Sequence, residues 1–116
     1  MKEIDECCEY ILSDVLGHVE GVTAKKMFSG YGLYYHGTIF GIITGVDELR
    51  FKVDDTTHSK YEEMGSTPFI FTGYKNRPPL TMHYYLVPEE VQENREEITT
   101  WLLDAVAVSK RSKRKK

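Results

Sequence analysis

Several features that define large classes of proteins are scarce in this 116-residue chain. Its two cysteines, Cys7 and Cys8, are adjacent on an expected helix, where they are poorly placed to bridge each other, and no second pair could build a disulfide framework. No run approaches the roughly 20 apolar residues that a membrane span requires, and the charged N-terminus has no signal-peptide core. We therefore expect a cytoplasmic protein with reduced thiols and no membrane contact.

Catalytic and metal-binding motifs are also missing. Gly30-Tyr31-Gly32 is a fragment of a dinucleotide fingerprint, but it runs into an expected strand instead of opening a helix that could hold a pyrophosphate. No serine has a nucleophile-elbow context, and the carboxylate pairs fall where helix capping and solvation explain them. None of the histidines has a ligand partner at metal-site spacing. We predict no catalytic, cofactor or metal residues, and a small-molecule enzyme is only the third hypothesis for function.

Positive charge is scarce everywhere except at the C-terminus. Residues 1–109 hold 9 Lys and Arg against all 18 Asp and Glu, a net charge of −9, which disfavours binding of a polyanion to the body of the protein. The end of the chain cannot bury apolar surface, so we predict a globular domain over 1–108 and a disordered tail over 109–116. Such a tail is a candidate for weak nucleic-acid contact. Its basic residues are Lys110, Arg111, Lys113, Arg114, Lys115 and Lys116.

Hydrophobic periodicity predicts three helices. Apolar residues recur at three- and four-residue steps from Ile4 to Val19, which is typical of an amphipathic helix. A second, short helix is expected between an N-cap cluster at 54–56 and a C-cap at Gly65. A last helix follows Asn94, which is a cap residue with Glu97 three positions later, and Ile98, Trp101 and Leu102 begin its buried stripe.

Five extended runs alternate with these helices. The first is the block 27–35, whose glycines indicate close backbone approach or a bulge, and the turn His36-Gly37 joins it to 38–44. The other runs are 49–53, 68–72 and 80–87, and in the last of these Met82, Tyr84 and Leu86 share one face. The order α-β-β-β-α-β-β-α predicts an α+β fold with a five-stranded, mostly antiparallel sheet and three helices packed on one face.

The pattern resembles the N-terminal domain of the TfoX (Sxy) family of bacterial competence regulators over most of residues 10–107. The stretches that carry the resemblance are 27–34, 49–54, Pro68-Phe69 and 80–91. Ser29 stands where the family more often has glycine, and Arg50 where an aromatic residue is common. The resemblance implies the same five-stranded sheet and three helices. Competence regulators of the family usually carry a second, helical domain, whereas here the last helix leads into the basic tail.

The resemblance implies a non-catalytic regulatory domain that acts through protein–protein contacts. Tyrosines are numerous on the expected sheet, and their rings suit an interface because they combine contact area with a polar tip. We therefore expect a regulatory protein partner, or a second copy of the chain, at an aromatic sheet face or edge. A nucleic-acid-binding accessory protein that uses the tail is the alternative. The candidate interaction residues are Lys25, Lys26, Phe28, Gly30, Tyr31, Gly32, Tyr34 and Tyr85.

Overall fold

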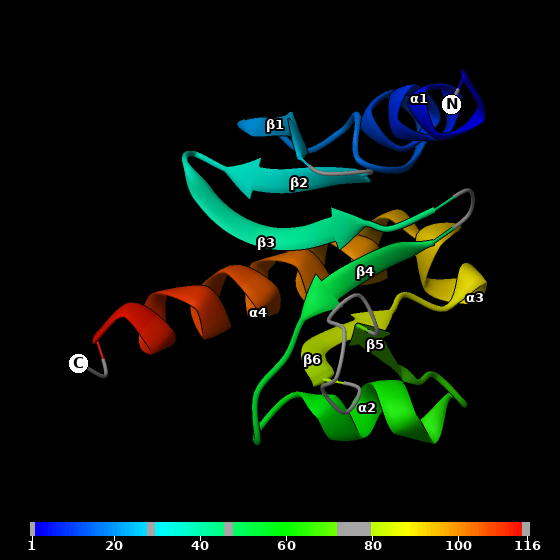
Figure 1. The fold of residues 1–116 in the computed structure, drawn as a ribbon. Coiled ribbons are helices and arrows are strands. Elements are labelled where there is room, and N and C mark those ends of the chain that lie inside the picture. Colours follow the sequence, from blue (N-terminus) through cyan, green and yellow to red (C-terminus); the bar gives the residue numbers. More distant parts are fainter. Residues whose placement is uncertain (1, 28–29, 46–47, 72–79, 115–116) are drawn as a thin grey trace.

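The structure is a computed structural model that describes residues 2–27, 30–45, 48–71 and 80–114. Figure 1 shows a single twisted sheet with helices behind it and at its ends. The strands are β1 (Val22–Met27), β2 (Gly30–Tyr35), β3 (Thr38–Ile43), β4 (Leu49–Lys52), β5 (Pro68–Phe71) and β6 (Leu80–Leu86). The helices are α1 (Lys2–Tyr10), the π-helix η1 (Ile11–Val15), α2 (His58–Glu63), α3 (Glu89–Gln92) and α4 (Arg95–Arg114).

The fold is α+β, as predicted, but the described residues form six strands and four α-helices instead of five and three. The additional strand is β1, which pairs antiparallel with β2 from Val22↔Tyr35 to Met27↔Gly30. Its sequence, Val-Thr-Ala-Lys-Lys-Met, gives only a weak strand signal, because the two adjacent lysines interrupt the alternation, and lysines are common on edge strands. The sheet order is β1-β2-β3-β4-β6-β5, with antiparallel neighbours throughout.

Two helical details also differ from the sequence-based expectation. The additional α-helix, α3, is one turn long and begins directly after Pro88, so it is too short to show a period. The helix expected over residues 4–19 ends its α-helical part at Tyr10 and continues as η1, where the Leu16 backbone N–H donates to the Ile11 carbonyl at 2.8 Å. This wider turn still buries Ile11, Val15 and Leu16.

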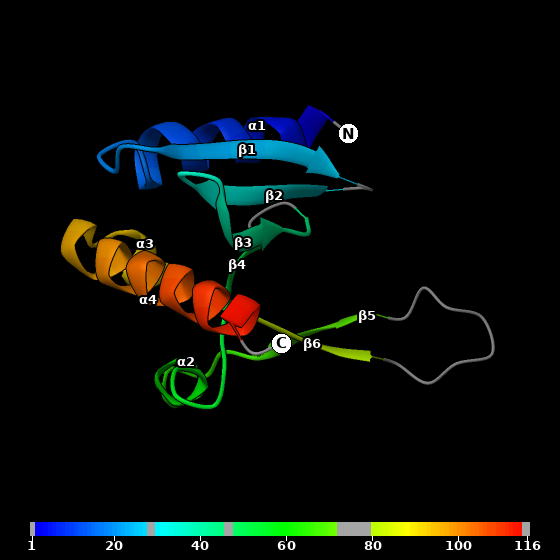
Figure 2. The ribbon, with the colours of Figure 1, turned by 90° about the vertical axis from the view of Figure 1, so that its left-hand side faces the viewer.

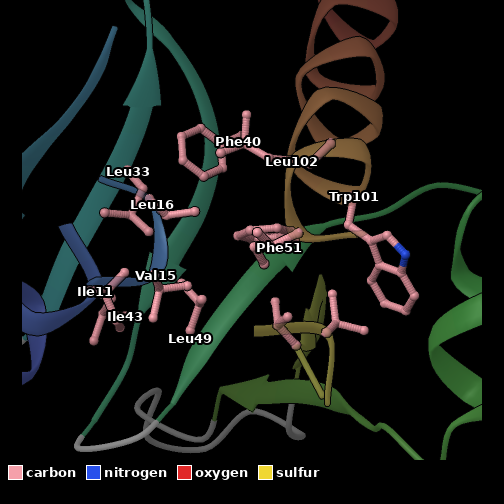
Figure 3. Packing of buried hydrophobic residues seen from close by; sticks show 14 of the residues in the cluster. Ile11, Val15, Leu16, Leu33, Phe40, Ile43, Leu49, Phe51, Trp101 and Leu102 are labelled. Atoms are coloured by element: carbon pink, nitrogen blue, oxygen red, sulfur yellow. The ribbon is translucent and has the colours of Figure 1, made fainter. Parts of the chain in front are cut away.

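One side of the sheet carries the hydrophobic core. In Figure 2, α2, α3 and α4 all lie on the same side of β3, β4 and β6. Figure 3 shows Phe40, Phe51 and Leu102 gathered between the sheet and α4, with Ile11 and Val15 of η1 near Leu49. The rings of Phe40 and Phe51 meet edge to face at a centroid distance of 5.4 Å. All six of these apolar side chains are fully or almost fully buried.

One turn and one helix cap confirm local predictions from the sequence. His36 and Gly37 both have positive φ, 48° and 86°, which is the geometry of the tight hairpin turn predicted between β2 and β3. The Asn94 side-chain oxygen accepts the backbone N–H groups of Glu96 and Glu97 at 3.1 and 3.0 Å, so it caps α4 as predicted.

The glycine block is explained in part by close packing of strands. A side chain at Gly30 would place its Cβ 2.1 Å from the Ile43 carbonyl oxygen, so a larger residue there would push β2 away from β3. This close contact explains, without any role in binding, why position 30 is a glycine.

The C-terminal helix differs from the predicted tail. α4 continues to Arg114, so most of the segment 109–116 belongs to the helix, and Val108 and Ser109 are buried. A contact distant in sequence holds this end: the Arg111 guanidinium donates to the Asp54 carboxylate at 2.7 Å. Nearer the middle of α4, the rings of Trp101 and Tyr61 pack at a centroid distance of 4.5 Å.

Candidate interaction surface on the open sheet face

Strand register separates the side chains of the sheet into two faces. Gly41 pairs with Phe51 on the helix-covered side, and the next row, Ile42 with Arg50, therefore points the opposite way. This second row runs across the sheet from Lys25 through Ile42 and Arg50 to Leu86. We call this side the open face and define it by Lys25, Tyr34, Ile39, Ile42, Arg50, Lys52, Phe69, Tyr84 and Leu86.

A β-bulge in β3 increases the apolar content of the open face. Leu33 pairs with Gly41 and Tyr34 pairs with Ile39, so Phe40 is an extra residue without a partner on β2. Because of this insertion, Phe40 points into the core while Ile39 and Ile42, three positions apart, both lie on the open face. Without the bulge, strict alternation would place only one of them there.

The apolar and aromatic side chains of the open face are half-buried by their neighbours. Tyr34, Ile39, Ile42, Tyr84 and Leu86 all have intermediate exposure, in contrast to the fully buried residues of the other side. Burial raises the pKa of the Tyr84 hydroxyl, and the nearby Tyr34 raises it further. Aromatic rings with such partial exposure are typical of interaction surfaces.

Cations lie directly over aromatic rings of this face. The Lys25 ammonium is 5.9 Å from the centroid of Tyr34, and the Arg50 guanidinium is 5.1 Å from that of Phe69. Arg50 also donates from Nε to the Thr44 hydroxyl at 3.2 Å and from Nη1 to the Thr67 carbonyl at 3.3 Å. Burial lowers the pKa of Arg50, although Glu48 opposes this effect. Arg50 is therefore a partly desolvated cation in a fixed orientation.

Negative charge is absent from the strands. None of the residues of β1 to β6 is Asp or Glu, so the carboxylates of the described residues all lie in helices or in the segments that connect the elements. The acids nearest along the chain to the open face are Glu48, two residues before Arg50, and Asp54, two residues after Lys52. Glu48 accepts from the Thr44 hydroxyl at 2.7 Å, and Asp54 pairs with Arg111. The sheet is thus cationic on a body whose overall charge is negative.

The residues predicted from the sequence are divided between the two faces. Lys25 and Tyr34 lie on the open face, and Gly32 lies between Lys25 and Ile42 in its central row. Gly30 is buried at the start of β2. Phe28 lies outside the described residues.

Tyr31, Lys26 and Tyr85 lie on the helix-covered side. The Tyr31 hydroxyl donates to the Asp5 carboxylate at 2.5 Å, which raises the pKa of Tyr31 to about 12, and the Lys26 ammonium lies 4.0 Å from the same carboxylate. The Tyr85 hydroxyl donates to Glu62 at 2.7 Å and helps to hold the pKa of that carboxyl below its usual range. These three residues connect the sheet to α1 and α2.

Sequence reasoning missed seven members of the open face: Ile39, Ile42, Arg50, Lys52, Phe69, Tyr84 and Leu86. The alternation Leu49-Arg50-Phe51-Lys52-Val53 already indicated that the two cations point away from the core. The sequence did not reveal the order of the strands. β4 lies between β3 and β6, and this places the two cations near Tyr84 and Leu86.

The basic residues near the C-terminus differ in their contacts and exposure. Arg111 is paired with Asp54 and also lies 3.2 Å from the Thr56 hydroxyl. Lys110 is exposed on α4. Lys113 and Arg114 belong to α4, and their side chains, like Lys115 and Lys116, lie outside the described part of the structure.

One surface cavity shares no lining residue with the open face. It has a volume of about 420 Å³ and lies between η1 and the junction of α3 with α4, where Asp14, Glu89, Glu93 and Arg95 contribute to its lining. Within the described ranges, no group of three His, Cys, Asp or Glu residues is arranged to hold a metal ion. In the same part of the chain, no helix has the length and apolar content to cross a bilayer.

Comparison of the chain with models of known protein families shows to which family it belongs. The model of the TfoX N-terminal domain matches residues 14–109. The chain belongs to the TfoX N-terminal domain family. No curated protein gives a significant match. The matched range begins in η1 and includes all six strands, so the open face of this TfoX N-terminal domain is formed entirely by the part of the chain that the family shares.

Proposed function

We propose that this TfoX N-terminal domain is a non-catalytic regulatory module that works by binding a protein through its open face. The observation that carries the proposal is the contrast between two sides of one sheet: one is covered by helices, and the other presents half-buried aromatic and aliphatic side chains without a helix of the described chain packed over them. Contiguous apolar surface of this kind is typical of protein interaction sites. Membership of the TfoX family supports a regulatory role.

The face suits a protein better than a small molecule. Its residues come from all six strands, so they are spread across the whole width of the sheet. The cavity between η1 and α3, by contrast, is lined mainly by polar and acidic side chains. Small-molecule sites are usually concave and mostly apolar. The cavity of about 300 Å³ that Leu86 helps to line also includes Pro88, Glu89 and Gln92, so it lies at the end of β6, at the margin of the open face.

Site-specific photo-crosslinking tests this proposal. A photoreactive amino acid is placed at Ile42 on the open face or, as a matched control, at Leu103, an apolar residue of α4 that is 45% exposed. The full chain is expressed in its native host and irradiated there. We expect a discrete protein adduct from position 42 and none from position 103. Equal adducts from both positions, or none from position 42, would contradict the proposal.

Nucleic-acid binding by the basic C-terminus is the second candidate, and Lys110, exposed on α4, is its observed element. Truncation after Ser109 would also remove the Arg111–Asp54 pair, so a cleaner variant replaces Lys110, Lys113, Arg114, Lys115 and Lys116 with Gln and keeps Arg111. Nucleic acid that is recovered with the full chain, lost with this variant and released by salt would favour the second candidate.

A further inference from the structure

We propose that the segment bound by the open face is acidic and amphipathic: its apolar side chains cover Ile39, Ile42 and Leu86, and its carboxylates pair with Lys25, Arg50 and Lys52. This inference rests on the proposed function and adds the chemistry of the partner. It follows from the charge of the face, the state of its cations and its dimensions.

The charge of the open face has one sign. Its three ionised side chains are all basic, whereas none of the six strands contains an Asp or Glu. A body with a net charge of −9 over residues 1–109 therefore keeps a cationic surface on a sheet face that also carries half-buried apolar side chains. Complementary charge steers association and sets the register of a partner, so a basic apolar face selects an acidic apolar segment.

The three cations have no ion-pair partner among the described residues. The ion pairs in that part of the chain involve Lys26, His58, Lys60 and Arg111, all of them on the helix side or at the end of α4. Arg50 is held in place by neutral acceptors, the Thr44 hydroxyl and the Thr67 carbonyl. A guanidinium that is already oriented and partly desolvated can pair with a carboxylate with little further loss of side-chain freedom.

Nucleic acid fits the same face less well. Binding of single strands depends on stacking of bases on open aromatic rings. Here Lys25 lies over the ring of Tyr34, and Arg50 lies over that of Phe69, so a base would have to displace a cation from each ring. The open face also contains Ile39, Ile42 and Leu86, which offer no stacking surface.

A second copy of the chain is also disfavoured on this face. Two open faces brought together would oppose their own Lys25, Arg50 and Lys52 without any carboxylate from the strands to neutralise them. Like charges in a symmetric interface oppose its formation.

The dimensions of the face set the length of the segment. The row from Lys25 on β1 to Arg50 on β4 crosses three strand spacings, which is about 14 Å. A helix rises about 1.5 Å per residue, so roughly ten residues would cross this row. Apolar residues on one side of such a helix and acidic residues at its flanks would match the pattern of the face.

Selection from a random peptide library tests the inference without assuming a sequence. Full-length protein is the bait, and a parallel selection uses Ile42→Ser, with the fold of both baits checked by circular dichroism. We expect wild-type protein to enrich peptides that are more acidic than the starting library and contain several apolar residues, and Ile42→Ser to enrich none of them. Enrichment of basic or uncharged peptides, or enrichment independent of Ile42, would overturn the inference.

Charge reversal then tests the role of the cations. The combination Lys25→Glu with Lys52→Glu should weaken binding of an enriched peptide by about tenfold or more, because two attractions become repulsions. Lys110→Glu with Lys113→Glu is the matched control, since it makes the same two changes of charge on α4, and it should alter the affinity less than twofold. Equal losses from both sets of changes would show that only net charge matters and would contradict the inference.

The remaining outcomes separate this inference from the proposed function. A photo-adduct at position 42 whose captured segment is basic or neutral refutes the acidic partner and leaves the protein-binding function standing. Absence of any protein adduct refutes the function itself. Two other results also overturn the inference: tighter binding of a single-stranded oligonucleotide to the open face than of any enriched peptide, or dimerisation in sedimentation that Ile42→Ser abolishes.

Discussion

The two faces of the sheet are built from the same strands but differ in how their side chains are used. On the helix-covered side, Phe51 is fully buried against Phe40 and the stripe of α4. On the opposite side, the adjacent residues Arg50 and Lys52 are half-exposed, together with Tyr84. Because neighbouring residues of a strand point to opposite faces, single-residue steps separate positions that determine stability from positions available for binding. Substitutions at these positions should therefore have separable effects.

The largest expected effect is on the free energy of unfolding after loss of a covered aromatic side chain. Phe51→Ala removes a fully buried ring and should destabilise the domain by about 3–5 kcal/mol. Ile42→Ala on the open face should cost about 1 kcal/mol or less, because that side chain remains partly in contact with water. Urea denaturation followed by circular dichroism measures both. Similar losses for the two variants would break the distinction between the faces.

The ion pair between Asp54 and Arg111 should make a smaller, pH-dependent contribution to the free energy of unfolding. Burial acts to raise the pKa of Asp54, but hydrogen bonds from Arg111 and Thr56 outweigh it and hold the pKa below its usual range. The unfolded chain then binds the proton more readily, so this stability is present near neutral pH and is lost as the pH falls below about 4.

Asp54→Asn should thus lower the free energy of unfolding at pH 7 by about 1 kcal/mol, and the difference from wild type should shrink in acid. Asp55→Asn is the control, because Asp55 is the exposed neighbour of Asp54. Denaturation curves at several pH values measure the effect. An equal loss at pH 7 and pH 3 would show that the pair does not stabilise the end of α4 through charge.

The smallest expected effect is on the ionisation of Tyr31. The hydrogen bond to Asp5 raises the pKa of Tyr31 to about 12, so the folded state retains this proton above the pH at which the unfolded chain releases it. Stability from this contact should fall as the pH rises above about 10. In Asp5→Asn, the pKa of Tyr31 should move down toward its ordinary value, as followed by NMR of a labelled tyrosine ring. Glu6→Gln, an exposed change of charge on α1, should leave it in place.

Local signals in the sequence predicted much of this fold. Alternation placed Leu49 and Phe51 on one face, and the positive φ of His36 and Gly37 follows from their place in a two-residue turn. The pairing of distant segments decided the rest. β1 forms a strand because β2 lies beside it, and the last turns of α4 persist where Arg111 meets Asp54, far away in sequence.

The candidate site was predictable only in part for the same reason. Period two shows that Tyr31 and Tyr34 point to opposite faces, but it does not say which face the helices cover. The bulge at Phe40, which places both Ile39 and Ile42 on the open face, depends on the register between β2 and β3 and has no local sequence signal. The cations of β4 join the site through sheet order alone.

Quantitative comparison of captured proteins tests the central claim most directly. Full-length wild type, Ile42→Ser and Leu103→Ser are expressed in the native host and isolated after a salt wash, and the proteins retained by each are measured by mass spectrometry. Both variants remove an exposed or half-exposed apolar side chain, one from the open face and one from α4. The account predicts a protein that is retained by wild type and Leu103→Ser and lost from Ile42→Ser. Retention of the same proteins by all three would contradict it.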